Sequence, residues 1–200
     1  MDDILTGRPL VAILRGVAPA DAVRLAHAVW DGGLGVVEVP IQTPSALLAL
    51  RAVAEAAAER GEIAGAGTVT STALVAHAAD VGARFTVAPG LDLDVMAASL
   101  AAGMPHLPGV GAATDVQRAL AAGVRWLKVF PAGALGAAWI RQMRGPFPEA
   151  QFVATGGIDA TNAAEFLHAG AVALGVGGSV TRPGGLESLI AAIRGVTDAR

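Results

Sequence analysis

Short apolar runs recur along the chain about every 20 to 25 residues, each followed by a Gly or Pro turn and then by an Ala- and Leu-rich stretch with helical spacing. Apolar runs of four to five residues, bounded by turn residues, are typical of buried strands. The pattern predicts eight of them, at 10–14, 35–39, 62–66, 84–87, 105–107, 125–129, 151–154 and 172–175. The chain therefore reads as repeated βα units.

The stretches between these strands predict helices over 19–30, 44–60, 71–81, 92–102 and 114–122. Several open with a Pro, Ser, Asp or Thr, residues that favour a helix start. Many end at a glycine just before the next strand, where the left-handed conformation can terminate a helix; these glycines are Gly33, Gly82, Gly103, Gly123 and Gly170.

Strands that do not alternate strictly between apolar and polar residues are expected where both faces of a parallel sheet are buried. Eight consecutive βα units fit an α/β fold of the (β/α)8 TIM-barrel type better than an open doubly wound sheet. No Gly-x-Gly-x-x-Gly pattern follows the first strand, which disfavours a dinucleotide site. We predict a single TIM-barrel domain over residues 1–200.

The composition excludes several classes of protein. With 54% hydrophobic and 16% charged residues, the 200-residue chain can bury one large core. Charged residues or histidine interrupt the Ala-rich segments, so no membrane span is predicted. A net charge of -3, scattered basic residues and no tyrosine disfavour a nucleic-acid partner. The acidic start, Met-Asp-Asp-Ile, does not resemble a secretory signal, and we expect a cytoplasmic protein.

A lysine interrupts one of the predicted buried strands: Lys128 stands between Leu127 and Val129. Desolvation of a lysine favours the neutral amine, which can attack a ketone and form a Schiff base. The alternative is a side chain that extends to the rim on its apolar stem or pairs with a carboxylate. This strand alone leaves both interpretations open.

Glu38 lies on the second predicted strand between Val37 and Val39. If these valines pack outward against helices, the period of two places Glu38 inside the barrel together with Lys128. The two could form a structural ion pair. Alternatively, a carboxyl with a raised pKa would transfer protons while the lysine acts as nucleophile. The two interpretations are compatible in a resting enzyme.

Two glycine-containing motifs follow the last two predicted strands: Thr155-Gly156-Gly157, and Gly177-Gly178-Ser179 one βα unit later. Either motif alone would be an ordinary turn. Together they predict a phosphate site, because glycine lets backbone amides approach an oxyanion, and TIM barrels often bind phosphate at these loops.

Other candidates lie at the ends of further strands. Arg15 could bind a carboxylate or form a surface salt bridge, and Thr68 could contact substrate or cap a helix. Pro89 ends the fourth strand, and Phe130 is expected to form part of the cavity wall. We expect His27, His77 and His168 on outer helix surfaces, and His106 at the start of the fifth strand, away from the active mouth.

Neither a metal nor another cofactor is predicted. The four histidines lack the spacing of a zinc site, and the chain contains no cysteine.

Several motifs in sequence order resemble the 2-keto-3-deoxy-6-phosphogluconate (KDPG) aldolase family, which includes 6-phosphogalactonate and 4-hydroxy-2-oxoglutarate (KHG) aldolases. They are Ile-Leu-Arg-Gly (13–16), Val-Glu-Val-Pro (37–40), Gly-Ala-Gly-Thr-Val (65–69), Ala-Pro-Gly (88–90), Pro-Gly (108–109), Leu-Lys-Val-Phe-Pro-Ala (127–132), Thr-Gly-Gly-Ile (155–158) and Gly-Gly-Ser (177–179). The resemblance implies a metal-independent class I aldolase, a carbon-carbon lyase, usually trimeric. Its substrate would be a phosphorylated keto-sugar acid, cleaved to pyruvate and glyceraldehyde 3-phosphate.

The resemblance also implies roles for individual residues. Lys128 would form the imine and Glu38 would move protons. The pyruvate end would be lined by Thr68, Pro89 and Phe130, and the phosphate would be held by Gly156, Gly157, Gly178 and Ser179.

One position departs from the gluconate-type pattern: Gln42 stands where those enzymes carry an arginine that binds the substrate carboxylate. Arg15 matches the galactonate-type branch and could take over this role. Two alternative functions are a 4-hydroxy-2-oxoglutarate or broader pyruvate aldolase and a non-catalytic barrel that binds phosphorylated ligands.

Overall fold

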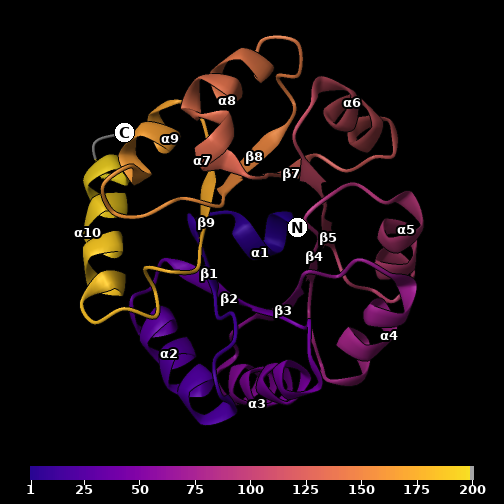
Figure 1. The fold of residues 1–200 in the computed structure, drawn as a ribbon, viewed down its shortest axis with the longest axis vertical. Helices are drawn as coiled ribbons and strands as arrows, with labels where there is room; N and C mark the ends of the chain where they lie inside the picture. The colour runs from indigo at the N-terminus through magenta and orange to yellow at the C-terminus, as the bar shows by residue number, and fades with distance from the viewer. Residues whose placement is uncertain (199–200) are drawn as a thin grey trace.

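The computed structural model describes residues 1–198 and shows a ring of helices around a barrel of parallel strands (Figure 1). The strands pair in the order β5-β4-β3-β2-β1-β9-β8-β7-β6. Their bounds are β1 (Leu10–Ile13), β2 (Gly35–Pro40), β3 (Ala64–Gly67), β4 (Thr86–Val87), β5 (His106–Leu107), β6 (Gly109–Val110), β7 (Trp126–Val129), β8 (Gln151–Thr155) and β9 (Ala173–Val176). The predicted TIM barrel is confirmed.

The described part of the chain forms ten helices, and the five predicted ones are found within one residue at each end. They are α2 (Pro19–Asp31), α3 (Pro44–Arg60), α4 (Thr72–Asp80), α5 (Leu93–Ala101) and α6 (Ala113–Ala121). The others are α1 (Asp2–Leu5), α7 (Ala132–Leu135), α8 (Ala137–Met143), α9 (Ala163–His168) and α10 (Gly185–Thr197). None of the helices within residues 1–198 has the length and apolarity needed to cross a membrane.

Pro108 divides the fifth barrel strand into β5 and β6, so the prediction of one strand over 105–107 was incomplete. Proline has no N–H for a strand ladder, but its carbonyl accepts a hydrogen bond from the Lys128 N–H at 2.9 Å. On the other side, Leu107 accepts from the Ala88 N–H at 3.1 Å. The segment therefore bonds to both neighbours and closes the barrel between β4 and β7.

The helix ends follow the chemistry of their cap residues. Thr43, Ser71 and Asp92 each accept a hydrogen bond from a backbone N–H in the first turn of α3, α4 and α5. The five glycines expected to end helices have φ between 70° and 105°, the left-handed region in which glycine is favoured. Local sequence thus sets where these βα units turn.

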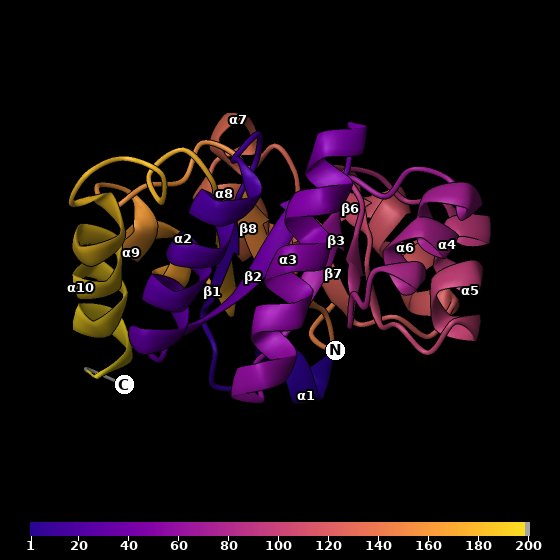
Figure 2. The ribbon, with the colours of Figure 1, turned by 90° about the horizontal axis from the view of Figure 1, so that it is seen from below.

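The core has an inner and an outer part. Outside the barrel, Val37 and Val39 pack with apolar helix faces. Inside, the lower half is filled by apolar side chains such as Val36 and Phe85, which pack with Leu5 of α1. Figure 2 shows α1 below the strands, at the end opposite the loops that follow them. The N-terminal helix therefore closes the bottom of the barrel.

A buried polar cluster joins α5 to the barrel wall. The Thr86 hydroxyl lies 2.7 Å from His106 Nδ1 and 2.6 Å from the Ser99 hydroxyl, which donates to the Met104 carbonyl at 2.9 Å. His106 begins β5, as predicted, but its 2% exposure was not foreseen, and its Nε2 has no partner within residues 1–198. Burial lowers the pKa of His106 from 6.5 to about 4, and the charge of Asp92 opposes the shift.

This cluster predicts acid sensitivity of the fold. Between pH 6.5 and about 4, the unfolded chain binds a proton at His106 that the folded protein does not, so the free energy of unfolding falls as the pH decreases through this window. The full effect is roughly 3 kcal/mol for a shift of this size. In urea unfolding at pH 7 and pH 4.5, we expect His106→Gln to lose less stability than wild type. His77→Gln, exposed on α4, is the control; equal losses in wild type and His106→Gln would contradict the prediction.

Candidate active site

Lys128 lies on β7, between Gly109 of β6 and Val153 of β8, and its side chain points into the barrel. It is 4% exposed, so it does not extend to the rim. Its Nζ lies 5.1 Å from the centroid of the Phe130 ring, and it belongs to none of the ion pairs found within residues 1–198. Lys128 is also the only lysine in the sequence. The only side-chain primary amine of this sequence therefore lies inside the barrel.

Glu38 lies on β2, opposite Gly65 of β3, and is 1% exposed. Its Oε1 has no hydrogen-bond partner within residues 1–198. Burial raises the pKa of the Glu38 carboxyl above its ordinary value, and the positive charges of Lys128 and Arg15 oppose part of this rise. A carboxyl in this state can hold a proton closer to neutral pH than an exposed one, which is the property required of a general acid.

Space for the two large interior side chains comes from glycines on β3. A β-carbon at Gly67 would overlap the Glu38 carboxyl, and one at Gly65 would overlap the Phe85 ring. Glycine at these two positions therefore lets Glu38 and Phe85 fit inside a small barrel.

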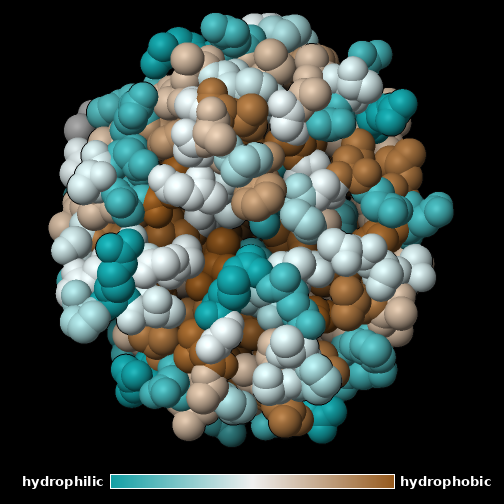
Figure 3. Space-filling view, in the orientation of Figure 1, coloured by the Kyte–Doolittle hydropathy of each residue, from teal (hydrophilic) through white to brown (hydrophobic). Residues whose placement is uncertain are grey.

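A cavity of about 710 Å³ opens at the C-terminal ends of the strands. Figure 3 shows a hollow at the centre of this face, with hydrophobic residues in its depth and hydrophilic residues at its edge. Every predicted site residue except Glu38, which is buried beside Gly67, contributes to the lining. The lining consists of Ile13, Arg15, Gln42, Thr68, Pro89, Lys128, Phe130, Thr155, Gly156, Gly157, Ile158, Asp159, Gly175, Gly177, Gly178, Ser179 and Arg182.

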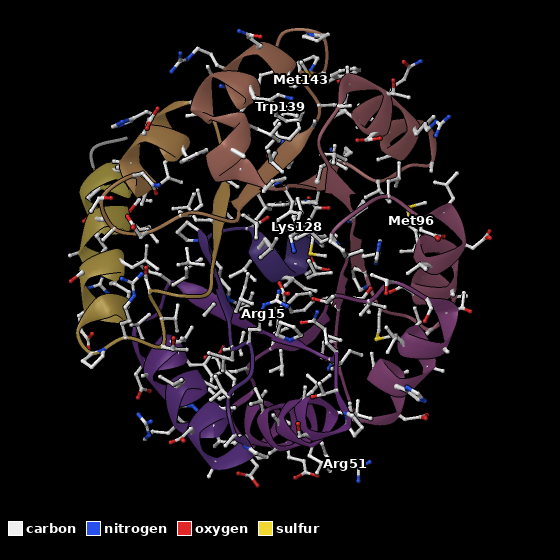
Figure 4. The ribbon with its side chains drawn as sticks, in the orientation of Figure 1. Arg15, Arg51, Met96, Lys128, Trp139 and Met143 are labelled. Atoms are coloured by element: carbon white, nitrogen blue, oxygen red, sulfur yellow. The ribbon has the colours of Figure 1, made fainter. Side chains whose placement is uncertain are left out.

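Arg15 and Gln42 meet at one side of this cavity. Arg15 follows β1, Gln42 follows β2, and Nη1 of the arginine donates a hydrogen bond to Oε1 of the glutamine. Figure 4 shows Arg15 and Lys128 near the barrel axis, coming from opposite sides. Gln42, which departs from the gluconate-type pattern, therefore contacts Arg15, the residue expected to bind the substrate carboxylate in its place.

Thr68 directly follows β3 and has φ of 57°, and it is the only non-glycine residue within 1–198 with a positive φ. Such a conformation is disfavoured for threonine, and residues of this kind cluster at functional sites. Thr68 lines the cavity, as predicted.

The two glycine motifs lie in the loops that follow β8 and β9, two neighbouring strands that pair with each other. The N–H groups of Gly157, Gly178 and Ser179 donate to no partner within residues 1–198. The Gly157 carbonyl, by contrast, accepts a hydrogen bond from the Asn162 side chain at 2.8 Å, which holds its loop in place. Ser179 is only 6% exposed yet lines the cavity. Free backbone donors on two adjacent loops form a suitable site for an oxyanion.

Sequence reasoning missed two charged residues of the lining, Asp159 and Arg182. Both follow glycine motifs that were recognised, at two residues after Gly157 and three after Ser179. Their position directly after these motifs was the sequence signal that could have identified them. Within residues 1–198, no cluster of three or more His, Cys, Asp or Glu could hold a metal ion. His77 and His168 are exposed on helices, and His27 is half-buried beside Arg60.

Comparison with known proteins agrees with this arrangement. The family model "KDPG and KHG aldolase" matches residues 1–189. A probable 2-dehydro-3-deoxy-6-phosphogalactonate aldolase of Rhizobium meliloti is 36% identical over 178 residues, 88% of this chain and 84% of its own. A 2-dehydro-3-deoxy-phosphogluconate aldolase of Zymomonas mobilis is 36% identical over 186 residues, 92% of this chain and 88% of its own.

A solved structure adds a chemical observation. The KDPG aldolase from Legionella pneumophila, with pyruvate captured as a covalent carbinolamine, superposes with a TM-score of 0.82 at 27% identity, covering 96% of this chain and 95% of its own. The buried lysine, the cavity at the strand ends and the paired glycine loops thus occur in a chain that matches these enzymes almost throughout. The chain belongs to the KDPG and KHG aldolase family.

Proposed function

We propose that this protein is a class I aldolase that cleaves 2-keto-3-deoxy-6-phosphogluconate, or its galactonate epimer, to pyruvate and glyceraldehyde 3-phosphate. The observation that carries the proposal is the placement of Lys128, the sole lysine, in the cavity together with Glu38, whose pKa is raised by burial. Free backbone N–H groups lie at the loops after β8 and β9. The site thus offers a nucleophile, a proton carrier and an oxyanion site.

The reaction starts with attack of the Lys128 amine on the C2 ketone to give a carbinolamine. Loss of water, with a proton from Glu38, gives a protonated imine. The imine accepts the electrons of the C3–C4 bond as it breaks, while a base takes the proton of the C4 hydroxyl and the aldehyde leaves. The remaining enamine is protonated at C3, and hydrolysis of the imine releases pyruvate. Glu38, directly or through water, serves these proton transfers.

The lining supports an orientation of the substrate in the cavity. Thr68, Pro89 and Phe130 would surround the pyruvate end, and Arg15 would leave Gln42 to bind the carboxylate through a charge-assisted hydrogen bond. Gly156, Gly157, Gly178 and Ser179 would bind the phosphate. Equal identity of 36% to a probable galactonate-type and to a gluconate-type relative supports neither C4 epimer over the other.

Two alternative functions would use the same site differently. The family description includes KHG aldolases, whose activity would make little use of the glycine loops. A non-catalytic barrel that binds phosphorylated ligands would leave the Lys128 amine without a chemical role.

The sole lysine makes the first test direct. With pyruvate and borohydride, we expect a stable adduct on wild type and none on Lys128→Met, because methionine keeps the volume but offers no amine. Intact mass and peptide mapping distinguish Lys128 from the N-terminal amine. Circular dichroism checks that both proteins are folded. An adduct on neither folded protein would overturn the aldolase mechanism.

Glu38→Gln tests the proton transfers. We expect turnover to fall by about 10²- to 10⁴-fold, the range of a general acid or base, while the pyruvate adduct still forms. Glu59→Gln, exposed on α3, is the control and should turn over like wild type. Wild-type turnover of Glu38→Gln would show that another group transfers the protons.

We further propose a homotrimer in the cytoplasm, as the family resemblance implies. Exposed leucines support association, since Leu48, Leu93 and Leu100 are 59%, 48% and 47% exposed. Light scattering after gel filtration should give about three times the mass of one chain. A mass of one chain at micromolar concentration would contradict the trimer.

A further inference from the structure

Arg182 lies in the loop between β9 and α10 and lines the cavity. Its Nε donates a hydrogen bond to the Gly178 carbonyl at 3.1 Å. Its terminal nitrogens take part in none of the hydrogen bonds or ion pairs found within residues 1–198. The side chain is therefore anchored to the glycine loop through one nitrogen, and its two outer nitrogens stay available.

The other two cationic residues of the lining, Lys128 and Arg15, belong to other strands and their ends. Lys128 lies on β7 and is the nucleophile, and Arg15 is hydrogen-bonded to Gln42 at the ends of β1 and β2. Arg182 is the cationic side chain that is bonded directly to a glycine motif. It therefore provides the positive charge at the loop that carries Gly178 and Ser179.

A negative charge lies at the same end of the cavity. Asp159 follows the Gly156-Gly157 loop, and its Oδ1 accepts hydrogen bonds from the Thr161 backbone at 2.8 Å and the Thr161 hydroxyl at 2.6 Å. These bonds, and to a smaller degree the charge of Arg182, hold the pKa of Asp159 below its ordinary value. A phosphate dianion bound here would face an ionised carboxylate.

Neutral backbone N–H groups donate hydrogen bonds to an oxyanion but do not supply a full opposing charge. A phosphate between the two glycine loops therefore needs a cation to offset both its own charge and that of Asp159. Arg182 meets this need, because a guanidinium can donate two parallel hydrogen bonds to two phosphate oxygens.

We propose that Arg182 recognises the charge of the substrate phosphate and makes the enzyme select phosphorylated over non-phosphorylated keto-sugar acids. The inference rests on the proposed aldolase function and adds a specificity-determining residue to it. The free N–H groups of Gly157, Gly178 and Ser179 hold the remaining phosphate oxygens.

Titration with inorganic phosphate, followed by ³¹P NMR, tests this without turnover. We expect Arg182→Gln to bind phosphate about 10- to 100-fold more weakly than wild type, the range for loss of a charge-assisted hydrogen bond. Arg182→Lys should fall between the two. Arg24→Gln is the matched control, because Arg24 is 70% exposed on α2 and pairs with Asp21. Equal phosphate affinity in wild type and Arg182→Gln would overturn the proposal.

Steady-state kinetics give the second measurement. For Arg182→Gln we expect the KM of the phosphorylated substrate to rise about 10-fold or more, with a smaller change in kcat. The KM of the same keto-sugar acid without phosphate should change by a much smaller factor. A similar rise for both substrates would indicate general damage to the site and would overturn the proposal.

Failure of the wild type to form a pyruvate adduct would remove the aldolase function but would leave the phosphate titration decisive for Arg182. The two hypotheses therefore fail on different measurements.

Discussion

Removing an amine and a carboxyl from water within one barrel is the constraint on which this structure depends. Burial disfavours the charged form of a carboxyl, and positive charges nearby oppose this effect. Glu38 shows the balance, since burial raises its pKa while Lys128 and Arg15 oppose the rise. The barrel provides this environment because its strands are buried on both faces and its lower half is apolar.

The same environment limits what can occupy the interior. Gly65 and Gly67 are required by the side chains of Phe85 and Glu38, so two glycines on one strand are explained by residues elsewhere in the barrel. Gly175 is similar, because a β-carbon there would overlap the Thr155 side chain. The site therefore depends on three glycines that have no side chain to take part in the chemistry.

The sequence predicts the parts of this protein that local chemistry controls. The βα rhythm, the helix starts at Ser71 and Asp92, and the inward face of Glu38 follow from period and residue type, and the structure confirms them. The division at Pro108 depends on how the barrel closes between β4 and β7, which no local pattern reports. The positive φ of Thr68, the contact of Arg15 with Gln42 and the anchor of Arg182 likewise depend on tertiary structure. The motifs gave the positions of the predicted site residues, whereas their partners came from the fold.

The position of α1 has a consequence for the order of events in catalysis. With Leu5 packed into the apolar interior and Figure 2 showing the helix below the strands, the cavity is a dead end with its entrance at the loops. In the proposed reaction, pyruvate stays attached to Lys128 in the depth after the carbon-carbon bond breaks, and the phosphorylated aldehyde lies nearer the entrance. The aldehyde must then leave first and pyruvate last. In the synthetic direction, the keto acid must bind to Lys128 before the aldehyde enters, so the covalent bond sets the order and the closed bottom of the barrel leaves one route for both.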